Sequence, residues 1–280
     1  MKSIDLHMHS IYSDGTYTPT QLVTYAKKKG LSAISLTDHD TIDGVDEARK
    51  QSEILNIQFI NGVEINSFYV LNNRRINIHV LGYAFDTKQM EPYMLKFKTL
   101  RYEHNEAIME ALHAIGIEIS YADMDMQSER NVVTRLNFAK ALVKKGYAET
   151  VNEALEKYLH KGGAAFVEYN NFDFSVVAKM IHDAGGIVSL AHPAEYGLND
   201  TEIENLITSL KREGLEAIEC IHPSQDIQYA NKLMQLAKKH SLKLTGGSDF
   251  HGNNSDGIEL GLGGNKMLIP ESFLMELGLE

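Results

Sequence analysis

Short apolar runs, separated by helix-like segments, constrain the fold of this chain most strongly. Runs rich in β-branched residues that alternate with amphipathic segments are typical of βα units in a parallel sheet. The segment after the first run shows the pattern, because Thr18 can cap a helix, Pro19 suits its first turn and Gly30 can end it. The sequence therefore predicts an α/β fold with seven strands, near residues 3–9, 33–39, 57–65, 76–84, 186–193, 217–223 and 242–251.

Each predicted strand ends in a residue that can bind a metal ion or a phosphate. His7 and His9 lie two positions apart, so both side chains share one face of their strand. In βα barrels the carboxyl ends of the strands carry the chemistry. We therefore predict one shared site at one face of a barrel, with contributions from His7, His9, Asp38, His39, Asp40, Glu64, His79, His192, His222, Asp249 and His251.

Imidazole and carboxylate groups together favour Mn, Fe or Zn, because Mg and Ca prefer oxygen ligands. Six of these histidines, with Asp14, Glu64 and Asp249, make more ligands than one ion can use. We therefore expect two or three divalent ions, with Glu64 as the candidate bridging carboxylate. The alternatives are a polar rim for the His7 and His9 pair and a salt-bridged strand end for Glu64.

The alternation of strands and helices is interrupted at residues 89–168, which read as helices. We interpret this segment as a helical cap over the mouth of a discontinuous barrel domain formed by residues 1–88 and 169–280. The single cysteine, Cys220, lies in an apolar run and is expected to be a core residue.

The net charge and the apolar runs limit the partners and the location of the protein. A formal charge of −11 disfavours binding to long nucleic acid, which relies on clustered Lys and Arg, but allows small phosphorylated ligands. The apolar runs are too short for a membrane span, and the first residues have no signal-peptide profile. We expect a cytoplasmic protein that does not contact membranes.

The motifs DLHMHSIYSDG, LTDHDT, GVE, HVLGY, LAHP and GSDFHG follow one another in this order. They resemble the motifs of the PHP family, named for polymerase and histidinol phosphatase, over nearly the whole chain outside the insertion. The resemblance implies a distorted seven-stranded βα barrel with a trinuclear metal cluster that hydrolyses phosphate esters. It implies three ligand sets: His7, His9, Glu64 and Asp249; Glu64, His79 and His192; and Asp14, His39 and His251.

Other residues are expected to support the metal ligands or to bind substrate. Asp38 and Asp40, which flank His39, are interpreted as carboxylates that orient imidazoles, and Asp40 is also a catalytic candidate. His222 is expected to donate to a phosphate or to protonate the leaving group, unless it is only a structural strand-end histidine.

Within the family, the insertion and the motifs IHPSQD and SDFHG most resemble the branch related to the trp operon. Its members are similar to 3',5'-nucleotide phosphatases and short-RNA 5'-to-3' exonucleases. That branch usually carries GRPH followed by ARALV, whereas this chain reads VTRLNFAKALV, with Leu136 and Asn137 in place of Pro and His. Arg135 is retained as the predicted phosphate clamp, with a helix-surface salt bridge as its alternative, and Asn137 is a second substrate-binding candidate.

The main functional hypothesis is a metal-dependent phosphoesterase in which metal-activated hydroxide attacks phosphorus. The expected substrate is a nucleoside 3',5'-bisphosphate that loses its 3'-phosphate, or the 5' end of a short RNA. The alternatives are a histidinol-phosphate phosphatase, with the same chemistry in a different pocket, and a metal-binding module without turnover. A zinc amidohydrolase is less favoured, because no lysine is suited to bridging two metals as a carbamate.

Overall fold

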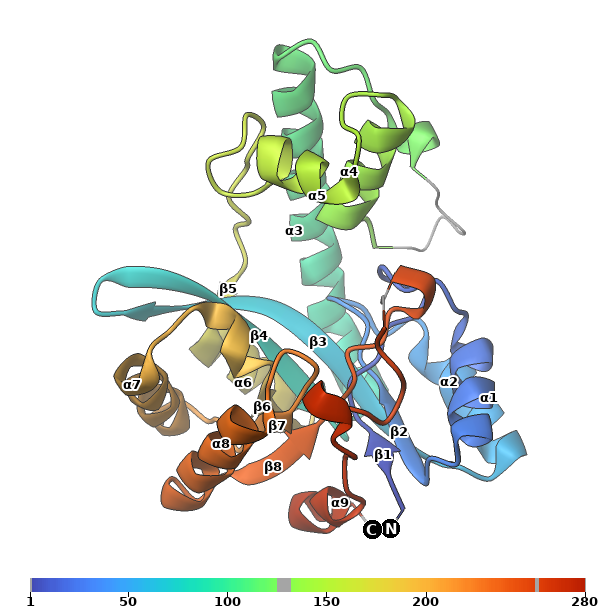
Figure 1. Cartoon of the computed structure of the whole chain (residues 1–280), viewed down its shortest axis with the longest axis vertical. Coiled ribbons are helices and arrows are strands. Elements are labelled where there is room, and N and C mark those ends of the chain that lie inside the picture. The colour runs from blue at the N-terminus through green and yellow to red at the C-terminus, as the bar shows by residue number, and fades with distance from the viewer. Residues whose placement is uncertain (1, 125–131, 255–256, 280) are drawn as a thin grey trace.

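The structure is a computed structural model that describes residues 2–124, 132–254 and 257–279. Its main sheet follows the order β1 (Ile4–Asp5), β2 (Ala33–Leu36), β3 (Gln58–Leu71), β4 (Arg74–Tyr83), β6 (Ile187–Leu190), β7 (Ala217–Ile221) and β8 (Lys243–Gly246). Backbone hydrogen bonds from Leu6 N to Gly246 O (3.1 Å) and from Asp249 N to His7 O (2.8 Å) join the last strand to the first. The sheet is thus a nearly closed barrel of seven strands (Figure 1), which confirms the predicted α/β barrel.

The sheet is not wholly parallel, and the prediction of parallel βα units is wrong for β4. This strand runs antiparallel to both of its neighbours, β3 and β6. Asn72 and Asn73 have φ angles of 51° and 62°, so they form a two-residue left-handed turn that joins β3 directly to β4. The resulting hairpin extends beyond the barrel (Figure 1), and its far part pairs with a short additional strand, β5 (Phe172–Asp173).

In the part of the chain that the structure describes, six helices lie outside the cap: α1 (Pro19–Lys29), α2 (Val45–Leu55), α6 (Phe174–Asp183), α7 (Asp200–Arg212), α8 (Ile227–Lys239) and α9 (Ser272–Leu277) (Figure 1). Helix α1 has the predicted signals, since Thr18 accepts a hydrogen bond from Gln21 N and Gly30 ends the helix at a φ of 79°. Its apolar face is buried at Leu22 and Val23. The apolar faces of the helices cover the sides of the barrel. The ends of the strands at the barrel mouth are not covered in this way and can carry polar groups.

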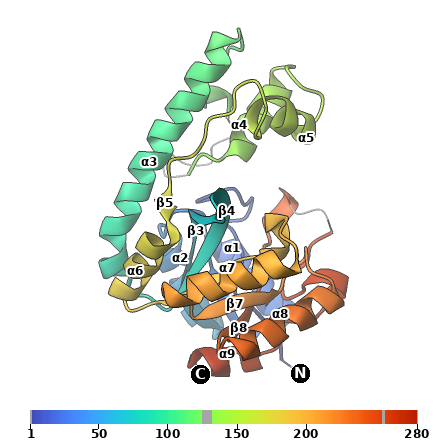
Figure 2. The ribbon, with the colours of Figure 1, turned by 90° about the vertical axis from the view of Figure 1, so that its left-hand side faces the viewer.

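The predicted cap contains α3 (Thr87–Ala114), a 3₁₀ turn (Tyr121–Asp123), α4 (Arg135–Lys144), α5 (Val151–Ala154) and a π-helical turn (Leu155–Leu159). Helix α3 rises from the barrel to the other cap helices (Figure 2). Its first half packs in the barrel core at Met94 and Phe97, whereas its second half packs with the cap helices at Ile108 and Leu112. The proposed boundary at residue 89 falls inside this helix and stays a prediction.

Two smaller expectations concern Cys220 and membrane spans. The Cys220 side chain is buried, as its apolar run predicts. Among the described residues, we find no helix with the length and apolarity that a membrane crossing requires.

Candidate metal centre

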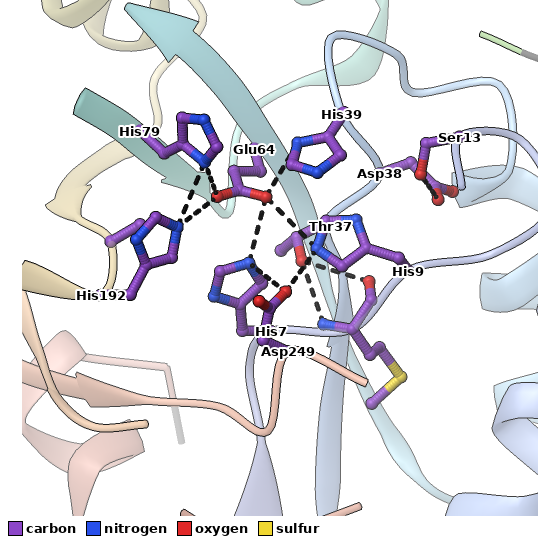
Figure 3. A network of polar contacts seen from close by, with 12 residues as sticks. His7, His9, Ser13, Thr37, Asp38, His39, Glu64, His79, His192 and Asp249 are labelled. Carbon is purple, nitrogen blue, oxygen red and sulfur yellow. Dashed lines mark hydrogen bonds and ion pairs between the residues drawn. The ribbon is translucent and has the colours of Figure 1, made fainter. Parts of the chain in front are cut away.

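Glu64, on β3, lies at the centre of a cluster of imidazoles at the barrel mouth (Figure 3). The side chain is only 1% exposed, and each of its two oxygens faces histidine nitrogens. Oε2 lies 3.2 Å from Nε2 of both His7 and His9 and 3.0 Å from Nδ1 of His39, while Oε1 lies 2.7 Å from Nδ1 of His79 and 2.9 Å from Nε2 of His192. A carboxylate surrounded in this way can bridge more than one cation.

Asp249 completes the first of the three ligand sets. Its Oδ1 lies 3.3 Å from His7 Nε2 and 2.9 Å from His9 Nε2. One ligand atom from each of His7, His9, Glu64 and Asp249 lies within 4.8 Å of the others. The four groups implied to hold one ion therefore converge on one point.

Asp14 and His251 form the opposite side of the cluster. Asp14 Oδ1 lies 3.1 Å from His251 Nε2, and its Oδ2 lies 3.7 Å from His39 Nε2. The structure adds His9 to this set, with ligand atoms within 4.8 Å and a ring stacked 4.1 Å from that of His251. His9 thus lies between two of the expected ion positions.

His79 and His192 meet at Oε1 of Glu64, with 3.2 Å between His79 Nδ1 and His192 Nε2. A set of Glu64, His79 and His39 also converges within 4.8 Å. The structure therefore brings all nine predicted ligands into one cluster, in which five histidines contact Glu64, although the roles of the nine as ligands and their assignments to ions stay predictions.

Several buried atoms in this cluster lack a hydrogen-bond partner. They include His7 Nε2, both ring nitrogens of His9, His39 Nδ1, Glu64 Oε2, Asp14 Oδ1 and Asp249 Oδ1. Burial of polar atoms without partners costs free energy, which bound cations would recover. The mixture of imidazole nitrogen and carboxylate oxygen fits divalent transition metals, so the residues present fit a metal cluster.

The pKa values in the cluster show how strongly its charges interact. Burial alone would lower the pKa of His39 and His251, but Glu64 and Asp14 raise the first to about 9, and Asp14 and Asp249 raise the second to about 10. Burial raises the carboxyl pKa values, yet the neighbouring imidazoles bring the pKa of Asp14, Glu64 and Asp249 below their ordinary range. The carboxylates thus retain protons on His39 and His251 unless metal cations balance their charge.

Three of the predicted site residues, at or near strand ends, have left-handed backbone angles. Asp40, His192 and Asp249 have φ values of 53°, 23° and 50°. This conformation costs about 1–3 kcal/mol for a non-glycine residue and tends to persist at functional sites. Packing of the barrel therefore holds these site residues in backbone conformations that they would not adopt alone.

Two buried carboxylates that the sequence reasoning missed support the ligands. Glu219, on β7, has Oε1 3.0 Å from His7 Nδ1, and its Oε2 accepts a hydrogen bond from His192 N at 2.7 Å. Asp5, on β1, accepts hydrogen bonds from the backbone N of His7 (3.2 Å) and of Ser248 (2.9 Å). The available signal was an acidic residue inside an otherwise apolar strand, since buried carboxylates need partners.

Asp38 does not have the expected role. Its described hydrogen bonds come from Ser10 N (2.7 Å), Ser10 Oγ (2.6 Å) and Ser13 Oγ (2.7 Å), and none comes from an imidazole. The prediction that Asp38 orients a histidine is wrong in this respect. It fixes the turn that leads to Asp14 instead.

Asp40 also lacks a described hydrogen bond to an imidazole. It accepts a hydrogen bond from Asn66 N at 2.9 Å and forms an ion pair with Arg101, on α3. Its carboxylate is 1% exposed. Asp40 therefore holds an arginine of the cap, and a direct catalytic part for it stays a prediction.

Two arginines of the cap, Arg101 and Arg135, line one pocket with the metal ligands Asp14, His39 and His79, and with Asn66, Thr134 and Leu136. Arg135 is the first residue of α4 and lies on this pocket, and its role as a phosphate clamp stays a prediction. Arg101 was missed, because one arginine on a long helix resembles an ordinary surface charge. Its guanidinium carbon lies 4.5 Å from the centre of the Tyr169 ring, and its buried Nε has no hydrogen-bond partner.

The remaining candidates, His222 and Asn137, differ in their surroundings. His222 is buried, with Nε2 3.4 Å from Asp249 Oδ2 and Nδ1 2.7 Å from Ser224 Oγ, so the structure brings it to the cluster. Asn137 Oδ1 accepts hydrogen bonds from Thr134 N (2.8 Å) and Thr134 Oγ1 (3.1 Å). Its oxygen therefore caps α4, and its part in substrate binding stays a prediction.

Comparison with known proteins places this site in a family. Residues 5–184 match the model of the PHP domain. The chain is 34% identical over 252 residues to a 5'-3' exoribonuclease of Haemophilus influenzae, covering 89% of this chain and 90% of that protein. It is 30% identical over 264 residues to a 3',5'-nucleoside bisphosphate phosphatase of Chromobacterium violaceum, covering 93% and 91%.

A crystal structure described as a metal-dependent phosphoesterase from Bifidobacterium adolescentis is also similar. Its TM-score is 0.84 at 26% identity, and the match covers 98% of this chain and 95% of that one. The fold, the ligand cluster and these similarities define a metal-dependent hydrolase of phosphate esters. The chain belongs to the PHP family, as its motifs predict.

Proposed function

We propose that this phosphoesterase acts on the phosphate attached to the 3' oxygen of a nucleotide whose 5' phosphate is held by the cap. The observation that carries the proposal is the pair Arg101 and Arg135 on the pocket that also contains Asp14, His39 and His79. A substrate with two phosphates fits this pocket, because the candidate metal ligands can act on one phosphate while the arginines bind the other. The similarity to a bisphosphate phosphatase and to an exoribonuclease supports this assignment.

One geometry serves both substrates. In a nucleoside 3',5'-bisphosphate, the 3' phosphate is a monoester, and in a short RNA with a 5' phosphate the same position is the first internucleotide phosphodiester. If the 5' phosphate lies at the arginines, either 3' phosphorus lies at the ligand cluster. Hydrolysis releases inorganic phosphate in the first case and a nucleoside 5'-monophosphate in the second.

The residues that would hold two or three divalent ions, with Mn, Fe or Zn as candidates, are His7, His9, Asp14, His39, Glu64, His79, His192, Asp249 and His251. Such ions supply positive charge to the phosphate oxygens and lower the pKa of water. Glu219 orients His7 through Nδ1, which leaves Nε2 directed at Glu64 and Asp249. His222, near Asp249, is our candidate donor to the leaving oxygen or to a phosphate.

The arginine pair is suited to an anion. Desolvation at the pocket and the positive charge of Arg101 lower the pKa of Arg135, so a phosphate between them would relieve repulsion. Planar guanidinium groups bind phosphate through paired hydrogen bonds and stay charged. Asp40 and the ring of Tyr169 hold Arg101 in place.

A substrate panel tests the proposal. Protein loaded with Mn should hydrolyse adenosine 3',5'-bisphosphate with a higher kcat/KM than histidinol phosphate, and ³¹P NMR should show loss of the 3' phosphate. A short RNA with a 5' phosphate should be degraded faster than the same RNA with a 5' hydroxyl. A higher kcat/KM for histidinol phosphate, or loss of the 5' phosphate, would reject the nucleotide assignment. An absence of turnover with Mn, Fe and Zn would favour the non-catalytic module.

Arg135→Ala tests the recognition step. Loss of a charge-assisted phosphate contact costs about 1.5–3 kcal/mol, or roughly ten- to a hundredfold in kcat/KM. We expect this loss for the bisphosphate and a much smaller one for a chromogenic monoester, with metal content unchanged. An equal loss for both substrates would place Arg135 at the reaction centre or in the fold.

A further inference from the structure

The cap contacts the barrel at the loop that carries Asp14. Lys140, in the second turn of α4, donates a hydrogen bond from Nζ to Asn254 Oδ1 at 2.7 Å. The amide nitrogen of Asn254 in turn donates to the backbone oxygen of Asp14 at 2.7 Å. Val132 N, just before α4, donates to Tyr12 O at 2.9 Å. Two separate contacts therefore join the start of the cap helix to one short loop.

This loop is attached to the barrel mainly at its beginning, through the hydrogen bonds of Ser10 and Ser13 to Asp38. Its end is attached to the turn that carries His251, since Thr16 N donates to His251 O at 3.2 Å. Asn254 lies in the 3₁₀ turn Gly252–Asn254, directly after His251. Asn254 therefore links the segments of two expected ligands of the same ion.

Helix α4 connects this contact to the substrate. Its first residue is Arg135, and Lys140 follows five positions later on the same ten-residue helix. Phe138 and Leu142 are fully buried in the cap core, so the helix moves as one unit with the cap. A phosphate held by Arg135 therefore acts on the same rigid element that contacts Asn254.

We propose that Lys140 and Asn254 are positioning residues that couple the cap to the Asp14 side of the metal centre. The contact chain from Lys140 through Asn254 to Asp14 makes two events support each other: the binding of a 5' phosphate at Arg135, and the retention of the ion at Asp14, His39 and His251. The proposal rests on the proposed function for the identity of the phosphate. Lys140 and Asn254 are not among the nine predicted ligands or the residues that line the arginine pocket.

Four variants separate the two hydrogen bonds. Lys140→Met removes the donor from the cap, and Asn254→Ala removes both bonds. Asn254→Asp keeps an acceptor for Lys140 but loses the donor to Asp14 O. The matched control is Lys145→Met, because Lys145 Nζ lies 3.2 Å from Asp123 Oδ1 in a pair that lies wholly within the cap.

Metal retention is the first measurement. Mn-loaded protein is mixed with excess chelator, and the release of each ion is followed with and without adenosine 5'-monophosphate, which retains the 5' phosphate. Coupled sites must affect each other reciprocally. In the parent we expect the nucleotide to slow the release of one ion by about three- to tenfold, the worth of one or two hydrogen bonds.

The variants should differ in a defined way. Lys140→Met should abolish the effect of the nucleotide with little change in its absence, whereas Lys145→Met should retain it. Asn254→Ala and Asn254→Asp should release one ion faster even without nucleotide. A nucleotide effect that survives Lys140→Met, or parent-like release from both Asn254 variants, would overturn the proposal.

Hydrogen exchange gives a readout that needs no nucleotide. In the Mn-loaded protein, exchange over residues 10–16 should increase in Lys140→Met and Asn254→Ala but not in Lys145→Met. If the parent does not bind adenosine 5'-monophosphate, the proposed function fails, and the exchange and nucleotide-free release data then decide the coupling alone. Unchanged exchange in both variants would reject it.

Discussion

Residues of the candidate metal centre and two arginines of the cap line one pocket, but the two groups are built differently. In the metal centre, side chains from the strand ends surround Glu64, and His7, His9 and Glu64 are at most 1% exposed. On the cap side, Arg101 and Arg135 come from two helices, α3 and α4, which reach the pocket through the cap. Under the proposed function, the barrel thus fixes the groups for the reaction, whereas the cap fixes the groups for recognition.

Because the two groups are held differently, substitutions in them should have different effects. A ligand on a strand end is held by the barrel and by buried partners such as Glu219, so its replacement disturbs the whole cluster. Arg101 of the cap, in contrast, is held by Asp40 and by the ring of Tyr169, which lie outside the cluster of candidate ligands. Substitutions on the two sides should therefore separate metal content and reaction rate from substrate choice.

The largest expected effect belongs to Glu64, which faces five imidazoles at once. Glu64→Ala should lower the metal content by more than one ion per chain, because both carboxylate oxygens are lost. Several kcal/mol of charge stabilisation by metal ions depend on it, so kcat should fall by about a thousandfold or more for the bisphosphate and for a monoester alike. Elemental analysis and steady-state kinetics measure both.

The control for Glu64 is Glu195→Gln. Glu195 is 47% exposed and lies 3.6 Å from His192 Nδ1, so it is a carboxylate near the cluster but outside its centre. We expect parent-like metal content and a kcat within about threefold, as for an exposed ion pair. Equal losses in both variants would mean that the number of negative charges near the cluster retains the ions, and not the central position of Glu64.

The candidate metal ligands could be predicted from sequence, whereas Arg101 of the cap could not, for a physical reason. Strands of a barrel end at the same face, so histidines and carboxylates at strand ends converge whatever the details of packing. That argument predicted eight of the nine candidate ligands, all except Asp14, and the structure places their side chains in one cluster. Arg101 reaches the pocket only because α3 crosses from the barrel to the cap, and one sequence does not reveal such a crossing.

Local signals explain the other differences. Asn72 and Asn73 are typical turn residues with left-handed angles, yet the run on either side of them was interpreted as two separate parallel strands. Glu219 and Asp38 show a second limit, since the partner of a buried carboxylate depends on which strands are neighbours. Glu219 contacts His7 across the closed barrel, while Asp38, next to His39 in sequence, contacts Ser10 and Ser13.

Glu219→Gln sharpens the comparison within the metal side. The amide keeps the shape of the side chain but removes the charge that orients His7, and loss of such a partner typically costs about ten- to a hundredfold in metal affinity or activity. Competition with a chelator measures the affinity. The matched control is Glu216→Gln, because Glu216 Oε2 lies 2.9 Å from His182 Nε2 in a partly exposed pair away from the cluster. Equal metal affinity in both variants would contradict a positioning role for Glu219.

The pH dependence of metal binding should also separate the two sides. In the metal-free protein, the pKa values of His39 and His251 are raised to about 9 and about 10, so at pH 7 both are protonated. Metal ions must displace these protons, and the affinity for Mn should rise by up to about tenfold per pH unit for each proton until pH 9–10. Proton release into a weakly buffered indicator solution counts them. A pH-independent affinity between 7 and 9 would contradict this.

The same pKa values determine how the stability of the metal-free protein depends on pH. The folded-state pKa of each histidine lies above its ordinary value of 6.5, so each stabilises the fold fully below that value. This contribution is lost as pH rises through 9–10. The Tm of the metal-free protein should therefore fall between pH 7 and 10, and that of the Mn-loaded protein should fall less. On the cap side the guanidinium groups stay charged throughout.

The smallest expected effect concerns Asn137. Its side-chain oxygen caps α4, and its amide nitrogen is the group that would contact a substrate. Asn137→Ala should lower the free energy of unfolding by about 1 kcal/mol, as for the loss of a helix cap, which urea denaturation measures. Asn137→Glu keeps an acceptor for Thr134 N, the usual arrangement in a capping box, so it should retain stability. If the amide nitrogen of Asn137 also binds substrate, kcat/KM for the bisphosphate should fall about two- to tenfold in both variants, the worth of one neutral hydrogen bond. A parent-like kcat/KM in Asn137→Ala together with the stability loss would make Asn137 a cap residue alone and leave recognition to the two arginines.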